Sequence, residues 1–375
     1  MREPAAGGSA REPLLDALRV LALAAVFVVN IGGYSVLPEG PAAPPRPEAS
    51  ALAQVAVFIV AALFQGKGYP LLAFLFGYSF ALSLRARRVA NPVAHRLRRM
   101  CRLLSIGVLH GTLFYAGDVL TIYAVCGFFL LALSAWRLEK LVVVLVFLGV
   151  LAVGSTLVFV VAGLLAIDGA TAVAGPSLAA PASMRAWLLV NANLYASSTI
   201  GALVFGLPAY LSLMLAGFIG GRLRWLSHPR WRPTLRKYRA WALPLGAIAN
   251  LLFAWATLRW LPQAPQVVAV LSLLTWLIGP LLLAGLVPWC VLRWQARPTP
   301  ILRWLAPAGA STLTLYLSSS LVGLLFLSGV GMALAPGSMA LLGNSLAAWA
   351  GLVWLLRNLA LRGVRLPLER WLARP

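Results

Sequence analysis

One histidine and one carboxylate lie close together inside otherwise apolar sequence. His110 falls within the stretch Arg98 to Gly127, and Asp118 follows it directly after Ala116-Gly117. The whole chain has only 9 acidic residues and 3 histidines. A histidine is the usual general base near neutral pH, and a carboxylate that accepts its other ring N–H fixes the tautomer and raises its basicity. The pair predicts a general base that takes a proton from the hydroxyl or amine of an acceptor molecule.

Two further side chains reach the same predicted level of the bundle. Asn30 and Tyr34 lie near the end of the first apolar segment, and both approach the extracytoplasmic face in the predicted topology. A purely structural interpretation remains open for the pair itself. In that case His110 bonds a neighbouring carbonyl, and Asp118 caps its helix with a side-chain oxygen.

Two cations are candidates for binding an anionic ligand. Lys67 lies between two glycines inside apolar sequence, where a charge costs at least about 2.5 kcal/mol unless it reaches water or a cavity. Arg19 follows Asp16 by one helical turn at the inner end of the first segment. The structural alternatives are a lysine that extends to the membrane surface and an interfacial ion pair worth roughly 0 to 1 kcal/mol.

Other polar residues give weaker signals. The stretch Ser311 to Ser320 places Ser311, Thr314 and Ser318 on one helical stripe, which is more typical of helix packing than of catalysis. The sequence has no G-x-S-x-G elbow, Walker loop, H-E-x-x-H or dinucleotide fingerprint. Its 3 cysteines have no metal-type spacing, so we expect neither a disulfide framework nor a metal site.

The composition identifies an integral membrane protein. The 375 residues are 61% hydrophobic and 11% charged, and apolar runs of about 20 residues recur, as membrane-crossing helices require. The net charge of +22 comes from arginines in short loops between these runs. We interpret them as topology signals facing anionic lipid and do not expect nucleic-acid binding.

The runs predict an all-α, polytopic helical bundle with about ten crossings and cytoplasmic N and C termini. Along the chain we expect a cytoplasmic N-terminal segment (1–17), one transmembrane domain (18–357) and a cytoplasmic basic tail (358–375). Charge parity allows only one net crossing between Ser50 and Arg85. We therefore predict a discontinuous helix near Gly66–Gly68, with residues 51–65 along or partly within the outer leaflet, and we leave open whether these residues cross the membrane. The expected spans are 18–36, 69–84, 100–116, 118–136, 141–167, 199–221, 240–260, 266–292, 310–327 and 339–356, and 184–195 is expected to be an interfacial helix.

Four stretches resemble the YeiB-like bacterial membrane proteins, a family with a domain of unknown function (418). They are LDALRVLALAAVFVVNI, FQGKGYPLLAFLFGYSFAL, the LHG and AGDVLTIYA around the histidine, and LPLERW near the end. The resemblance covers most of the chain and implies a multi-pass protein of the bacterial inner membrane. Residues 309–316 depart from the family pattern, because a basic residue and an asparagine are missing there.

The first segment is distantly similar to membrane-bound acyltransferases, including heparan-glucosaminide acetyltransferase and the sugar O-acyltransferases. Asn30-Ile31-Gly32-Gly33 matches the former, and the latter have a histidine where this chain has Asn30. Neither catalytic histidine is present, so His110 would have to take that role. This similarity implies acyl-CoA as donor substrate and an acceptor at the extracytoplasmic face.

We therefore expect an acyltransferase-like protein with His110 as base, Asp118 orienting it, Asn30 stabilising the oxyanion, and Arg19 and Lys67 holding donor anions. A second hypothesis is a small-solute transporter or exporter with a midplane site at Lys67. A third is a lipid-handling protein without turnover. Expected partners are membrane lipids, the acyl donor and its acceptor, with self-association as a homodimer left open.

Overall fold

A computed structural model describes residues 12–34, 50–85, 92–167, 183–261 and 263–374 of the chain. These residues form helices and turns, with no strand among them. The helices and helical turns, in order, are α1 (Pro13–Tyr34), α2 (Ala51–Ile59), the π-helix η2 (Val60–Phe64), α3 (Gly68–Arg85), α4 (Pro92–Leu113), α5 (Leu120–Leu133), α6 (Leu138–Ala166), α7 (Met184–Gly201), the π-helix η4 (Ala202–Gly206), α8 (Leu207–Leu223), η5 (Pro229–Trp231), α9 (Arg232–Trp260), α10 (Pro265–Leu271), η6 (Ser272–Leu274), α11 (Thr275–Ala296), α12 (Pro300–Leu305), η7 (Ala306–Ser311), α13 (Thr312–Leu327), α14 (Ser338–Leu361) and α15 (Pro367–Ala373).

The predicted all-α polytopic bundle is confirmed. Within the described ranges, 8 helical segments are long and apolar enough to cross a membrane. Two more of the predicted crossings correspond to α4, whose first half carries arginines, and to α5, an apolar helix of 14 residues. The count of ten crossings and the orientation of the termini stay predictions.

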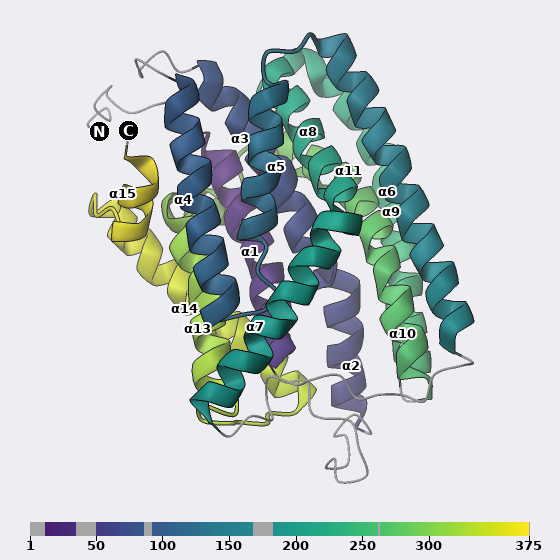
Figure 1. Cartoon of the computed structure of the whole chain (residues 1–375). Coiled ribbons are helices and arrows are strands. Elements are labelled where there is room, and N and C mark those ends of the chain that lie inside the picture. Colours follow the sequence, from purple (N-terminus) through teal and green to yellow (C-terminus); the bar gives the residue numbers. More distant parts are fainter. Residues whose placement is uncertain (1–11, 35–49, 86–91, 168–182, 262, 375) are drawn as a thin grey trace.

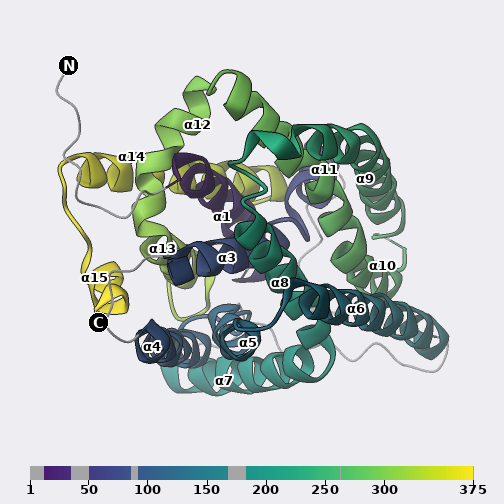
Figure 2. The same cartoon turned by 90° about the horizontal axis from the view of Figure 1, so that it is seen from above.

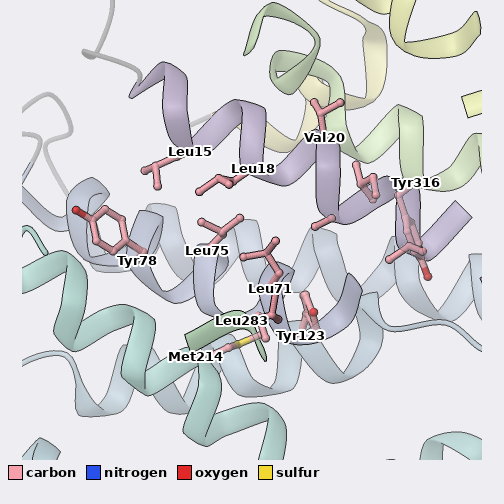
Figure 3. Close-up of a cluster of buried hydrophobic side chains, with 14 of the residues drawn as sticks. Leu15, Leu18, Val20, Leu71, Leu75, Tyr78, Tyr123, Met214, Leu283 and Tyr316 are labelled. Atoms are coloured by element: carbon pink, nitrogen blue, oxygen red, sulfur yellow. The ribbon is translucent and has the colours of Figure 1, made fainter. Parts of the chain in front are cut away.

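Two helices occupy the middle of the bundle. In the view along the helices, α1 and α3 lie at the centre, with α4, α5 and α7 along one side and α9 to α11 along another (Figure 2). Leu15 and Leu18 of α1 point toward Leu71 and Leu75 of α3 in the main hydrophobic cluster (Figure 3). The outer helix α6 exposes many valines and leucines, as expected for a surface that faces lipid.

Helices α3 and α8 pack in direct backbone contact, and two glycines make this approach possible. A Cβ on Gly77 of α3 would overlap the carbonyl oxygen of Met214, and a Cβ on Gly217 of α8 would overlap that of Phe74. Small residues at such crossings let two backbones meet directly, which is the usual basis of helix packing in membranes. The pair fixes α3 against α8 along most of its length.

The second helical element is broken where the sequence predicted it. α2 and η2 end at Phe64, the turn covers residues 65–67, and α3 starts at Gly68. Gly66 has a positive φ of 73°, which side chains disfavour, and its Cβ would also meet Thr275 of α11. In Figure 1, α2 continues below α3, so residues 51–64 run along the bundle.

Several predicted boundaries were wrong. Residues 92–100, expected in a loop, form the first turns of α4, because Pro92 suits the first helical position and the arginines are good helix formers. The expected single-residue link at Gly117 is a six-residue turn, 114–119, between α4 and α5. α1 begins at Pro13, and the division into a cytoplasmic segment 1–17, a transmembrane domain 18–357 and a basic tail 358–375 stays a prediction. The predicted end of the first span and the outer segment 168–182 lie outside the described residues.

The residues of the expected interfacial helix, 184–195, are helical, and their position relative to the membrane surface stays a prediction. They form the first part of α7, which continues through η4 into α8 as one helical segment of 40 residues. Trp187 is fully buried, and the Asn191 side chain donates to the carbonyls of Gly111 and Thr112. α7 therefore packs along the end of α4 instead of lying apart from the bundle.

Arginines gather at one end of the bundle, which we call the basic end. There Arg96 of α4 donates to the Ser83 carbonyl, Arg102 to backbone carbonyls of α15, and Arg222 of α8 to the Trp136 carbonyl. Arg232 of α9 meets Gln295 of α11. The turns predicted to be cytoplasmic thus lie together, as the charge pattern indicated.

Candidate functional site

His110 is held between two oxygen atoms in the half of the bundle away from the basic end. Its Nδ1 lies 2.8 Å from Oδ1 of Asp118, and its Nε2 lies 2.9 Å from Oγ of Ser320. The three residues come from α4, the 114–119 turn and α13. His110 is 3% exposed and Ser320 is fully buried, so the chain of contacts lies within the protein and is shielded from water.

The Asp118 carboxylate accepts four hydrogen bonds. Oδ1 accepts hydrogen bonds from Nδ1 of His110 and, at 3.2 Å, from the Tyr316 hydroxyl. Oδ2 accepts from the backbone N–H and the hydroxyl of Thr121 at 2.9 and 3.0 Å. With the carboxylate acting only as acceptor, Nδ1 of His110 carries the proton and Nε2 presents its lone pair to Ser320. Oδ2 therefore caps the first turn of α5 while Oδ1 lies against the histidine, and the catalytic role of Asp118 stays a prediction.

The local backbone explains why these groups meet. α4 ends just past His110, where the Phe114 and Tyr115 N–H groups both return to the His110 carbonyl. The following turn brings Asp118 back beside the last turn of α4. Asn191 of α7 satisfies two of the carbonyls that the helix end leaves free. Tyr195, one turn further along α7, hydrogen-bonds to the Thr121 hydroxyl at 2.8 Å.

Sequence analysis missed Ser320. It emphasised Ser311, Thr314 and Ser318, whose hydroxyls serve helix packing and capping: Thr314 meets Glu369 of α15, and Ser318 returns to the Thr314 carbonyl. The buried face of α13 instead carries Tyr316, Ser319, Ser320, Gly323 and Leu327. The i, i+4, i+7, i+11 spacing from Tyr316 through Ser320 is the signal that could have identified this face.

Asn30 and Tyr34 lie beside the serine pair of α13. The Asn30 amide is 3.5 Å from the Ser319 hydroxyl, so it approaches the serine next to Ser320. Tyr34 donates to the Phe114 carbonyl and stacks on Tyr115 with ring centroids 5.0 Å apart. The first segment thus supplies two polar groups next to the His110 cluster.

Arg19 lies apart from this cluster. Its guanidinium forms an ion pair with Asp16 at 2.5 Å and hydrogen-bonds to Ser79 of α3. The structural alternative of an i,i+3 ion pair is therefore present in the fold. Its role as a ligand for donor anions stays a prediction.

Lys67 lies at the helix break, far from water. It is 6% exposed, and its ammonium donates to the Ala61 carbonyl in η2 at 2.7 Å. The π-helical turn leaves this carbonyl available, and the lysine returns to it instead of extending to the surface. Lys67 also borders a cavity between α1, η2, α9 and α11.

The other two histidines lie at the basic end. His228 precedes η5 and accepts the Arg230 N–H on its Nδ1. Burial, together with Arg99, Arg96, Arg98 and Arg102, lowers the pKa of His95. Within the described residues, no group of three His, Cys, Asp or Glu side chains could hold a metal ion.

The Ser320–His110–Asp118 arrangement can perform nucleophilic chemistry. A histidine oriented by a carboxylate and hydrogen-bonded to a serine hydroxyl is the recognised geometry for activating that hydroxyl, and it recurs on unrelated folds. A hydroxyl so activated can accept an acyl group and pass it on. Burial within apolar helices would protect such an ester from water.

Comparisons with known proteins point to a family without an assigned activity. Residues 220–370 match the model of a family described as protein of unknown function (DUF418), which confirms the family recognised from the motifs. The match contains α13 with Ser320 and the tail motif with Glu369. A 129-residue stretch is 37% identical to an uncharacterized 39.9 kDa protein in the amylase 3' region of Bacillus acidopullulyticus. The alignment covers 34% of this chain, which spans about a third of the length of that relative.

Proposed function

We propose that this chain, whose residues 220–370 match the DUF418 family model, is a membrane-bound acyltransferase that forms an acyl ester on Ser320. The observation that carries the proposal is His110, whose two ring nitrogens join Asp118 at 2.8 Å and Ser320 at 2.9 Å. A buried structural histidine can satisfy its donor and acceptor nitrogens with any polar groups. Here both partners are the ones that serine activation requires.

The two half-reactions follow from this geometry. Nε2 of His110 takes the Ser320 proton as Oγ attacks the thioester carbonyl, and the departing thiolate takes that proton from Nε2. An acceptor hydroxyl then gives its proton to Nε2 while its oxygen attacks the ester, and Ser320 leaves with the proton. Asp118 stabilises the transient imidazolium in both steps. Asn30 is the candidate donor to the oxyanion.

The sidedness of transfer follows from the position of the site. His110 lies near the end of α4, with most of that helix between it and the basic end. An acceptor would then enter from the extracytoplasmic face, and a thioester donor such as acyl-CoA would be recruited from the cytoplasm. Arg19, closer to the basic end, is the candidate for contacting donor anions in this scheme.

Trapping the acyl-enzyme tests the proposal. Purified protein in detergent is incubated with acetyl-CoA or palmitoyl-CoA without acceptor, and the peptide that contains Ser320 is examined by mass spectrometry. We expect one acyl group on Ser320 in the wild type and none in Ser320→Ala or His110→Ala. The matched control is Ser319→Ala, which removes the adjacent and equally buried hydroxyl and should still be acylated.

Two results would contradict the proposal. The first is acylation of Ser320→Ala to the same extent as the wild type. The second is turnover of acyl-CoA by His110→Ala at the wild-type rate in a variant that retains its melting temperature. Either would show that the histidine network serves the fold alone.

Transport of a small solute is a second candidate, favoured by the helix break. A 34-residue helical segment is interrupted at a buried lysine, as in transporters whose broken helices form substrate sites. Solute flux in proteoliposomes that is lost in Lys67→Ala and retained in Ser320→Ala would favour transport over acyl transfer.

A further inference from the structure

A second polar site lies on the other side of α1, in a cavity of about 380 Å³. This volume falls in the roughly 300–1,000 Å³ range of small-molecule sites in proteins. Helices α1, α3, α9 and α11 and the π-helix η2 form its walls. The lining side chains are almost all aliphatic, and the two strongly polar ones are Lys67 and Asn250.

Lys67 is the only charged residue of this lining. Its ammonium has three N–H groups, and the Ala61 carbonyl accepts one hydrogen bond from it. Among the described residues, no carboxylate forms an ion pair with it. A buried cation without a counter-ion is costly in a low dielectric, and an anionic ligand would remove that cost.

Asn250 supplies a second unsatisfied atom. Its amide nitrogen donates to the Gly246 carbonyl at 2.7 Å and to the Ile278 carbonyl at 3.1 Å, which fixes the orientation of the side chain. Its Oδ1 has no hydrogen-bond partner, and the residue is 2% exposed. Buried carbonyl oxygens of this kind normally have a partner. The cavity therefore presents a donor and an acceptor on otherwise aliphatic walls.

The cavity opens toward lipid. Leu63 of η2 and Leu251 of α9 line it and are 61% and 49% exposed. Both belong to helices at the outer surface of the bundle, where exposed leucines face acyl chains. A ligand can enter from within the bilayer without passing through the basic end.

We propose that this cavity binds a long-chain fatty acid from the bilayer. The carboxyl group lies against the Lys67 ammonium, and the alkyl chain lies along the aliphatic side chains of α1, α9 and α11. One carboxyl oxygen accepts from Nζ. When the shared proton resides on the acid, its hydroxyl donates to Oδ1 of Asn250. The carboxyl group thus meets both unsatisfied atoms of the cavity.

The lining distinguishes this head group from other lipid head groups. A phosphate needs several donors for its oxygens, and Lys67 is the only cation of the lining. A long-chain alcohol would bring no negative charge to the ammonium. The binding site stands on its own residues and does not depend on acyl transfer at Ser320.

Direct binding measurements test the proposal. The protein in phosphatidylcholine nanodiscs is titrated with palmitate labelled with ¹³C at the carboxyl carbon, and bound acid is followed by its carbon resonance. We expect saturable binding, weakened about tenfold or more in Lys67→Met, which removes a charge-assisted hydrogen bond. Lys140→Met, at an exposed lysine near the start of α6, is the matched control and should bind like the wild type.

A second variant and two competitors make the test decisive. Ala247→Phe fills the cavity without removing a polar group, so it should also abolish binding. Hexadecanol and phosphatidylglycerol should displace palmitate poorly. Equal binding by Lys67→Met and wild type, or displacement by hexadecanol or phosphatidylglycerol at the concentrations at which palmitate itself competes, would overturn the proposal. Ser320→Ala should bind palmitate normally, so failure here and failure of acyl transfer remain distinguishable.

Discussion

The two buried polar clusters of this bundle differ in how completely their hydrogen bonds are satisfied. Around His110, both ring nitrogens and all four acceptor sites of Asp118 have partners. Around Lys67, the ammonium meets one carbonyl and the Asn250 oxygen has no partner. A complete network is rigid and preorganised, as catalysis requires. An incomplete one beside a cavity gains free energy when a ligand supplies the absent partner.

The largest expected effect comes from breaking the complete network at its carboxylate. Asp118→Asn keeps the shape, but its amide would favour the other tautomer of His110, with the proton on Nε2. In Ser-His-Asp enzymes this change lowers kcat about 10⁴-fold. We expect a comparable loss of Ser320 acylation, measured as the rate of acyl-enzyme formation from acyl-CoA.

The same variant separates the two clusters. Palmitate binding to Asp118→Asn should stay at the wild-type level, because Asp118 does not line the Lys67 cavity. An acylation rate within a few-fold of wild type would show that the carboxylate only caps α5. A loss of both properties would indicate that the substitution unfolds the bundle.

The second prediction concerns the helix pair on which both clusters depend. α3 follows directly after Lys67, and α8 continues α7, which carries Asn191 and Tyr195. Gly77→Ala would force α3 and α8 apart, because the new methyl group meets a backbone carbonyl that cannot move aside. We expect the free energy of unfolding to fall by about 3 kcal/mol, which is the upper part of the range for overpacked cores.

Thermal unfolding in detergent measures this effect. The matched control is Gly149→Ala on α6, where nothing lies within 4 Å of the new Cβ, so the melting temperature should be unchanged or slightly higher. Equal melting temperatures for the two variants would contradict the direct backbone contact of α3 with α8.

The sequence predicted one cluster better than the other because of chain distance. His110 and Asp118 are 8 residues apart, so a helix end and a short turn suffice to join them. Ser320 is 210 residues from His110, and its contact depends on how α13 packs against α4. Likewise the break at Gly66 is visible in sequence, whereas Asn250 lines the same cavity as Lys67 only through the packing of α9 against η2.

The boundary errors have a common physical origin. Charge asymmetry locates which side of the membrane a segment faces, and it carries no information on whether the backbone is helical. The arginines between Pro92 and Arg102 therefore marked the correct end of the bundle while being assigned to a loop. Pro92 was the local signal for a helix start, because proline suits the first helical position.

The third prediction is that one substitution in each cluster changes the stability of the protein in opposite directions. Tyr316→Phe removes a donor to Asp118 and an acceptor for the Val119 N–H, so it should cost about 1–3 kcal/mol. Lys67→Met removes a buried unpaired charge worth roughly 2.5–3.5 kcal/mol in a membrane. It frees one carbonyl at a cost of about 0.5–1.5 kcal/mol. The net effect is about 1–3 kcal/mol of stabilisation.

Denaturation of ligand-free protein, delipidated in detergent, measures both changes. Tyr316→Phe should melt lower than wild type and Lys67→Met higher. Added palmitate should raise the melting temperature of the wild type and leave that of Lys67→Met unchanged, because only the former gains a counter-ion. Destabilisation by Lys67→Met in the absence of ligand would show that its bond to Ala61 is the dominant interaction and that the lysine is structural.

The smallest expected effect tests how α13 is positioned for catalysis. Glu369 of α15 accepts the backbone N–H and the hydroxyl of Thr314, both at 2.9 Å, so the tail motif caps the first turn of the helix that carries Ser320. Glu369→Gln keeps one acceptor oxygen and loses the negative charge at the helix N-terminus, which should cost about 1 kcal/mol.

The exposed Glu139 in the first turn of α6 provides the control, since Glu139→Gln should change stability by only a few tenths of a kcal/mol. Because α13 contributes to the His110 cluster and not to the Lys67 cavity, Glu369→Gln should slow Ser320 acylation while palmitate binding is unchanged. Equal changes in both would mean that α15 stabilises the whole bundle and does not position the serine.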